Sequence, residues 1–156
     1  MREQFQEELN AVNATLVEMA VLVKAAVENA TTALLTADLS LAEKVIADDL
    51  IIDEIQHELD AKSINLIARQ SPVATDLRAL VTSLRMSADL ERMGDLAHHI
   101  AKSARMRYPA TAVPPELSLT IEEMGRVCVK IIEKMALVVK NKDTERALEM
   151  EKDDDE

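Results

Sequence analysis

Glycine, proline and aromatic residues are scarce in this chain of 156 residues, and their scarcity restricts its fold class. The chain has two glycines, four prolines, one tyrosine, one phenylalanine and no tryptophan, while 48% of its residues are hydrophobic. Its core must therefore be aliphatic, and this composition favours long helices over sheets. We predict an all-α protein.

Cysteine and basic side chains are also in short supply. Cys128 is the only cysteine, so the chain cannot form an internal disulfide, and a reducing, cytoplasmic setting is expected. Acidic residues outnumber basic residues by 29 to 18, which gives a formal net charge of −11. Such a surface repels phosphate backbones, so we expect no nucleic-acid partner and favour cations or basic protein surfaces instead.

Long uninterrupted apolar segments are missing as well. The stretch MREQFQEELN at the N-terminus has no apolar signal-peptide core. The longest apolar region, from Met19 to Leu35, is interrupted by Lys24 and Glu28, and we predict that it is too short and too charged to span a membrane. We therefore expect membrane association only through partner proteins.

The apolar residues that are present recur in alternating steps of three and four, as in helices that bury one face. They predict helices over residues 2–35, 39–68 and 72–106. Asp38 or Ser40 would cap the second helix, and Ser71 followed by Pro72 would begin the third. Because the connections are short, we expect an antiparallel up-down-up bundle over residues 1–108, with a coiled coil to another chain as the alternative.

The remaining residues resemble the beginning of a second bundle. Residues 109–115 contain three prolines and read as a rigid linker. Further helices are predicted over residues 116–140 and 143–156, and aligning Asp38 with Asp143 makes them a repeat of the first two. Since this bundle would lack its third helix, we expect a truncated chain that self-associates through the exposed apolar faces of these two helices.

Two pairs of carboxylates are spaced so that each pair projects from one face of its helix. Asp49 and Asp53 are four residues apart, and so are Glu91 and Asp95. The second pair continues an apolar seam, where carboxylates are costly unless something pairs with them. For the first pair a solvated acidic face is the alternative. Two antiparallel helices can bring four such carboxylates around one metal ion.

Two histidines and a glycine accompany the second pair. His99 follows Asp95 by four residues and extends the acidic stripe, whereas His98 lies nearer the apolar seam, and either could be a metal ligand. Gly94 in mid-helix costs roughly 1 kcal/mol relative to alanine, which fits a close approach of another helix or a metal. Oxygen ligands suit iron, manganese or magnesium, and an imidazole would also admit zinc.

Two ordered motifs resemble the PhoU family of phosphate-signalling proteins. R-Q-x-P-V-A-x-D-L-R occupies residues 69–78, and D-L-E-R-M-G-D occupies residues 89–95. Candidate partner-facing residues within them are Arg69, Gln70, Pro72, Asp76, Arg78 and Arg92. The resemblance implies two tandem three-helix bundles that hold metal clusters, here on Asp49, Asp53, Glu91 and Asp95. His99 stands where many members have asparagine, and Asp154 would belong to an unfinished second site.

The same resemblance implies a regulatory function. PhoU-like proteins damp phosphate uptake and repress the phosphate-starvation response, and they bridge the phosphate ABC transporter, through its ATPase subunit, and a phosphate-sensing histidine kinase. We therefore predict a non-enzymatic regulator with iron or zinc, or else manganese or magnesium, and a homodimer or higher assembly. The alternatives are a ferritin-like metal protein, suggested by Glu54-x-x-His57, and a metal-free helical interaction module.

Overall fold

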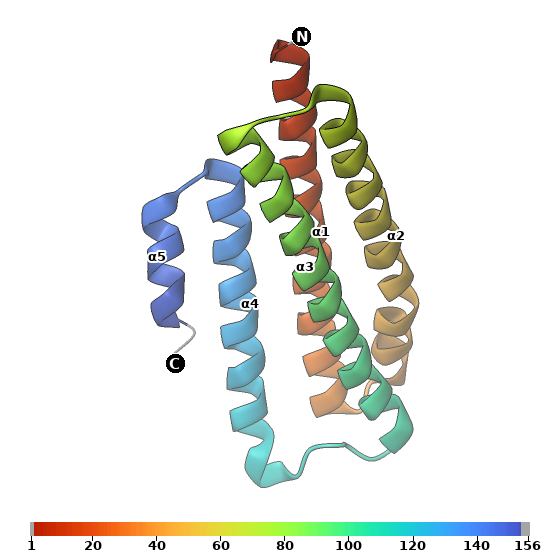
Figure 1. Cartoon of the computed structure of the whole chain (residues 1–156). Coiled ribbons are helices and arrows are strands. Elements are labelled where there is room, and N and C mark those ends of the chain that lie inside the picture. The colour runs from red at the N-terminus through yellow and green to blue at the C-terminus, as the bar shows by residue number, and fades with distance from the viewer. Residues whose placement is uncertain (1, 154–156) are drawn as a thin grey trace.

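The computed structural model describes residues 2–153, which form a helical bundle with no strand. The elements are α1 (Arg2–Thr36), α2 (Leu39–Gln70), α3 (Ala74–Arg107), the 3-10 helix η1 (Pro115–Leu117), α4 (Ser118–Asn141) and α5 (Thr144–Asp153). In the first three, α2 runs antiparallel to α1 and α3, which are parallel to each other, and all three pack together (Figure 1). The predicted all-α class and the three-helix bundle are confirmed.

α4 lies alongside α1 and antiparallel to it, and α5 folds back on the outer side of α4 (Figure 1). In the described part of the chain, α4 contacts α1, α5 and η1 but not α2 or α3. Ile132 of α4 is only 1% exposed and joins the core that the first three helices form. Part of the apolar face of α4 is therefore covered by α1.

Two layers of different composition make up the core. Over most of the bundle it is built from large aliphatic side chains, among them Leu16, Met19, Leu59, Leu66, Leu80 and Leu90. Near the α1–α2 turn it becomes a layer of small residues, among them Ala30, Ala33, Ala42, Ala97, Ala101 and Ala104. Since alanine leaves little side-chain volume between helices, the three backbones approach one another closely there.

The start of α3 differs from the sequence prediction. Ser71 does not cap α3; it ends α2 in a left-handed conformation with φ of 43°, and its N–H donates to the Ile67 carbonyl at 3.0 Å. The reason is steric, because Pro72 disfavours a right-handed helical conformation at the residue before it. α3 begins at Ala74, and Val73 precedes it without a side-chain cap.

Asp38 is the N-cap of α2, as one of the two predicted alternatives required. Its Oδ1 accepts a hydrogen bond from the Leu41 N–H at 2.9 Å. We expect Asp38→Ala to lower the unfolding free energy by about 1 kcal/mol, because a free N–H would be left at the helix start. Urea denaturation measures the change. Ser40→Ala is the control and should have little effect; equal losses in both variants would contradict the assignment.

α1 deserves separate mention because its length and apolar composition are sufficient to cross a membrane. The longest apolar region of the sequence, residues 19–35, predicts no span. The core helix of a bundle can have the length and composition of α1, and α1 supplies Leu16, Met19 and Val23 to the core.

Candidate functional site

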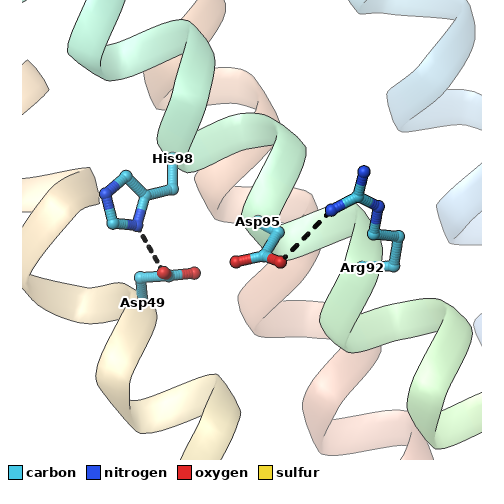
Figure 2. Close-up of polar contacts among 4 residues, drawn as sticks. All are labelled: Asp49, Arg92, Asp95 and His98. Atoms are coloured by element: carbon cyan, nitrogen blue, oxygen red, sulfur yellow. Dashed lines mark hydrogen bonds and ion pairs between the residues drawn. The ribbon is translucent and has the colours of Figure 1, made fainter.

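The most buried carboxylate of the described chain faces a histidine across the α2–α3 interface. Asp49 of α2 is 8% exposed, and its Oδ2 contacts Nδ1 of His98 on α3 (Figure 2). Gly94 makes this approach possible, because a Cβ there would lie 3.1 Å from Ile52 Cδ1 and 3.6 Å from Asp49 Oδ1. A side chain at this position would therefore crowd α2 beside the carboxylate.

Three more carboxylates surround this pair and repel one another. Partial burial raises the pKa of Asp53, and the charges of Asp49 and Asp95 raise it further. The pKa of Glu91 is also raised, first by burial and then by the charges of Asp95, Asp53 and Asp49. These mutual effects mean that the four carboxylates share one electrostatic environment.

Basic groups compensate this charge only in part. Arg92 Nη1 lies 3.5 Å from Asp95 Oδ2, and the arginine also opposes the rise in the pKa of Glu91 (Figure 2). The Arg92 side chain is largely exposed, so this ion pair contributes little to stability. The cluster therefore keeps an excess of negative charge that a cation would relieve.

The other predicted candidates lie further out. His99 is exposed, with its ring centroid 6.0 Å from that of His98. His57 and Glu54 are both exposed, and His57 Nδ1 lies 2.8 Å from the Asp53 carbonyl oxygen. The structure thus does not gather this Glu-x-x-His pair with the carboxylates. Asp154 lies outside the described residues.

The carboxylates and the imidazole of this cluster are suitable ligands for a metal ion, although their side chains do not point to one common position. Four carboxylates offer hard oxygen ligands, and His98 Nε2 is buried without a hydrogen-bond partner. Within residues 2–153, however, no three Asp, Glu, His or Cys side chains are placed as ligands of one ion. Binding therefore requires side-chain reorientation within the cluster.

One polar contact of this interface was not predicted. Ser87 Oγ donates to Asp60 Oδ1 at 2.9 Å, and Gln56 Nε2 donates to the other oxygen of Asp60 at 2.6 Å. Asp60 lies on the same helix as Asp49 and Asp53, but nothing in the sequence identified its partner. The sequence feature that could have indicated this contact is Ser87, a small polar residue on the buried face of the third helix, where two helices can approach closely.

The motif residues at the α2–α3 turn occupy varied positions. Arg69 donates to Glu8 Oε2 at 2.8 Å and to Asn65 Oδ1 at 2.5 Å, beside a groove of about 500 Å³ between α1 and α2. Of the other motif residues, Gln70 ends α2 and Pro72 is in the turn. At the start of α3, the Asp76 N–H donates to the Val73 carbonyl and the Arg78 side chain is exposed. Their role toward partners stays a prediction.

Glu91→Gln is expected to stabilise the metal-free protein by about 0.5 kcal/mol near pH 7, because it removes one of several like charges. The folded-state pKa of Glu91 is raised above its ordinary 4.5, so folding favours the protonated form. The penalty is therefore absent well below pH 4.5 and grows as pH rises through the raised pKa. Urea denaturation from pH 4 to 8 measures it. A variant less stable than the parent at pH 7 would contradict the reading.

Fold and site together define a class of protein: an all-α bundle with a carboxylate cluster between two antiparallel helices. The family model described as "PhoU domain" matches residues 16–104. PhoU homolog 2 of Mycobacterium tuberculosis, a phosphate-specific transport system accessory protein, is 43% identical over 155 residues, covering 99% of this chain and 73% of the relative. The chain therefore belongs to the PhoU family.

Other relatives agree with this assignment. PhoU homolog 1 of Mycobacterium leprae is 41% identical and is covered over 70% of its length. The crystal structure of PhoU from Pseudomonas aeruginosa superposes with a TM-score of 0.84 at 28% identity, over 93% of this chain and 69% of that chain. PhoU from Streptococcus pneumoniae has a TM-score of 0.85 at 24% identity, over 97% and 70%, and supports the fold.

Proposed function

We propose that this chain is a cytoplasmic, non-enzymatic regulator that damps the phosphate ABC transporter and represses the phosphate-starvation response. The observation that carries the proposal is family membership, since the PhoU domain spans most of the first three helices. The relatives PhoU homolog 2 of Mycobacterium tuberculosis and PhoU homolog 1 of Mycobacterium leprae are named as phosphate-specific transport system accessory proteins. The partners would be the ATPase subunit of the transporter and the phosphate-sensing kinase.

The acidic surface supports docking to basic protein surfaces and disfavours nucleic acid. Membrane association would be indirect, through the transporter. The motif residues at the α2–α3 turn lie at one end of the bundle, where Arg78 is exposed, and we assign them to partner contact.

The carboxylate cluster is proposed to hold a metal ion or cluster, with Asp49, Asp53, Glu91 and Asp95 as oxygen ligands. Iron and zinc are favoured if an imidazole joins, and manganese or magnesium if oxygen ligands act alone. When bound, the cation would supply positive charge that ties α2 to α3. The raised pKa values of Asp53 and Glu91 support this role, because burial and then the charges of neighbouring carboxylates both disfavour their ionised forms.

Self-association through α4 and α5 is proposed from their uncovered apolar side chains. Leu119 is 79% exposed and Leu148 is 70% exposed. We expect light scattering to give at least twice the chain mass of 17.3 kDa. Leu119→Lys with Leu148→Lys should shift the protein to monomer, whereas Leu50→Lys, at an exposed position of α2, should not. A monomeric parent protein at working concentration would contradict the proposal.

The regulatory role can be tested in a bacterium that lacks its own PhoU-type protein. Expression of the chain should return a phosphate-starvation reporter to its low level in phosphate-rich medium. The variant Glu91→Gln with Asp95→Asn should lose this effect if the cluster is required, and Asp48→Asn, whose carboxylate pairs with Lys44, should keep it. A folded, expressed chain that leaves the reporter high would refute the proposed function.

A further inference from the structure

We infer that His98 occupies Asp49 through the contact of its Nδ1 with Asp49 Oδ2, and that a metal ion must displace this contact to bind Asp49. The inference rests on the proposed metal site and concerns how that site is regulated. His98 would then be a competitor of the metal for Asp49, and neither a permanent ligand nor a bystander.

The first step is the need of Asp49 for a hydrogen-bonding partner. At 8% exposure an isolated carboxylate would be costly, and such groups are normally paired. The nearby basic side chains are engaged elsewhere, since Arg92 pairs with Asp95 and Lys44 pairs with Asp48. Among the described residues, His98 supplies the side-chain contact to Asp49.

The second step is the direction of the imidazole. Nδ1 faces Asp49, while the other ring nitrogen lies on the side of the ring away from Asp49 and Asp95 (Figure 2). That nitrogen, Nε2, is buried and has no hydrogen-bond partner. His98 is therefore oriented to hydrogen-bond Asp49 through Nδ1, while Nε2 points away from the carboxylates.

The third step is that one oxygen of Asp49 is already occupied. Oδ2 contacts His98, while Oδ1 faces the space that Gly94 leaves by lacking a Cβ. For Asp49 to serve as a ligand, its contact with His98 must be broken.

Metal titration of three proteins tests the inference. Isothermal titration with Mn²⁺ and Zn²⁺ compares the parent chain, His98→Ala and the control His99→Ala, which alters an exposed neighbouring ring. We expect His98→Ala to bind about tenfold more tightly than the parent, because no contact must be given up, and His99→Ala to bind like the parent. Binding by His98→Ala alone would also support the inference.

The contrary outcomes separate this inference from the proposed function. Weaker binding by His98→Ala would make His98 a ligand, and unchanged binding would make it a bystander; either result overturns the inference while the metal site stands. If none of the three proteins binds either metal, both fail.

A second measurement needs no substitution and guards against a misfolded variant. In ¹⁵N NMR of the parent chain, the His98 ring should report an Nδ1 hydrogen bond without metal, and this signature should disappear when Zn²⁺ is added. Persistence of the hydrogen bond in the zinc-bound protein, or a shift of either ring nitrogen typical of zinc ligation, would overturn the inference.

Discussion

Gly125→Ala is expected to lower the unfolding free energy by about 1–3 kcal/mol and to loosen α4 from α1. A Cβ at this position would lie 2.7 Å from Thr31 Cγ2 and 2.8 Å from Thr31 Oγ1. The threonine cannot easily turn away, because its hydroxyl donates to the Val27 carbonyl at 2.8 Å. Alanine gains about 1 kcal/mol of helix propensity over glycine, which offsets part of the loss.

A double-mutant cycle in urea denaturation measures this clash directly. Thr31→Ala removes the two closest atoms, so Gly125→Ala should cost far less in that background. Gly94→Ala provides a comparison, because its nearest neighbour at 3.1 Å is the flexible end of Ile52. Simple addition of the two single effects would mean that α1 and α4 are not in this contact in solution.

Metal binding is expected to stabilise the protein strongly. At a free concentration 100 times the Kd, a ligand that binds only the folded state raises the unfolding free energy by about 2.7 kcal/mol. With Mn²⁺ we expect this gain as a higher denaturation midpoint that a chelator reverses. The physical cause is neutralisation of the carboxylates, since burial and then mutual repulsion raise the pKa of Asp53 and Glu91.

Paired variants locate this gain in the cluster. Asp95→Asn with Glu91→Gln should abolish the metal-dependent stabilisation, while the metal-free protein stays folded. Asp48→Asn alters a neighbouring carboxylate that pairs with Lys44 and should retain the full effect. A gain that survives in the first variant would place the cation elsewhere on this acidic chain.

The helices of the bundle were predictable because the spacing of apolar residues within each segment indicates a helix without knowledge of its neighbours. Apolar spacing fixes which residues share a face, and Leu16, Met19 and Leu59 are buried as that spacing requires. The contact of α4 with α1 was not predictable in the same way. It depends on Gly125 meeting Thr31, two residues from distant segments with no pattern that links them.

The site was predicted at the level of its carboxylates and less well at its histidines. Spacing of four residues brings Glu91 and Asp95 to one face, and it favoured His99 as the next member. The structure turns His98 toward Asp49 and leaves His99 exposed. Adjacent helical residues differ by about 100° in direction, so the choice depends on how α3 is rotated against α2, which spacing alone does not specify.

α1 packs against α2 and α3 on one side and against α4 on the other, and this position affects how a change in the carboxylate cluster reaches α4. α4 meets α1 but neither α2 nor α3 in the described part of the chain (Figure 1). A change in charge or spacing between α2 and α3 can therefore reach α4 through its packing against α1, besides the direct chain connection through residues 108–117. α1 is thus the packed element between the carboxylate cluster and α4, so substitutions at Thr31 would alter this coupling while leaving both ends intact.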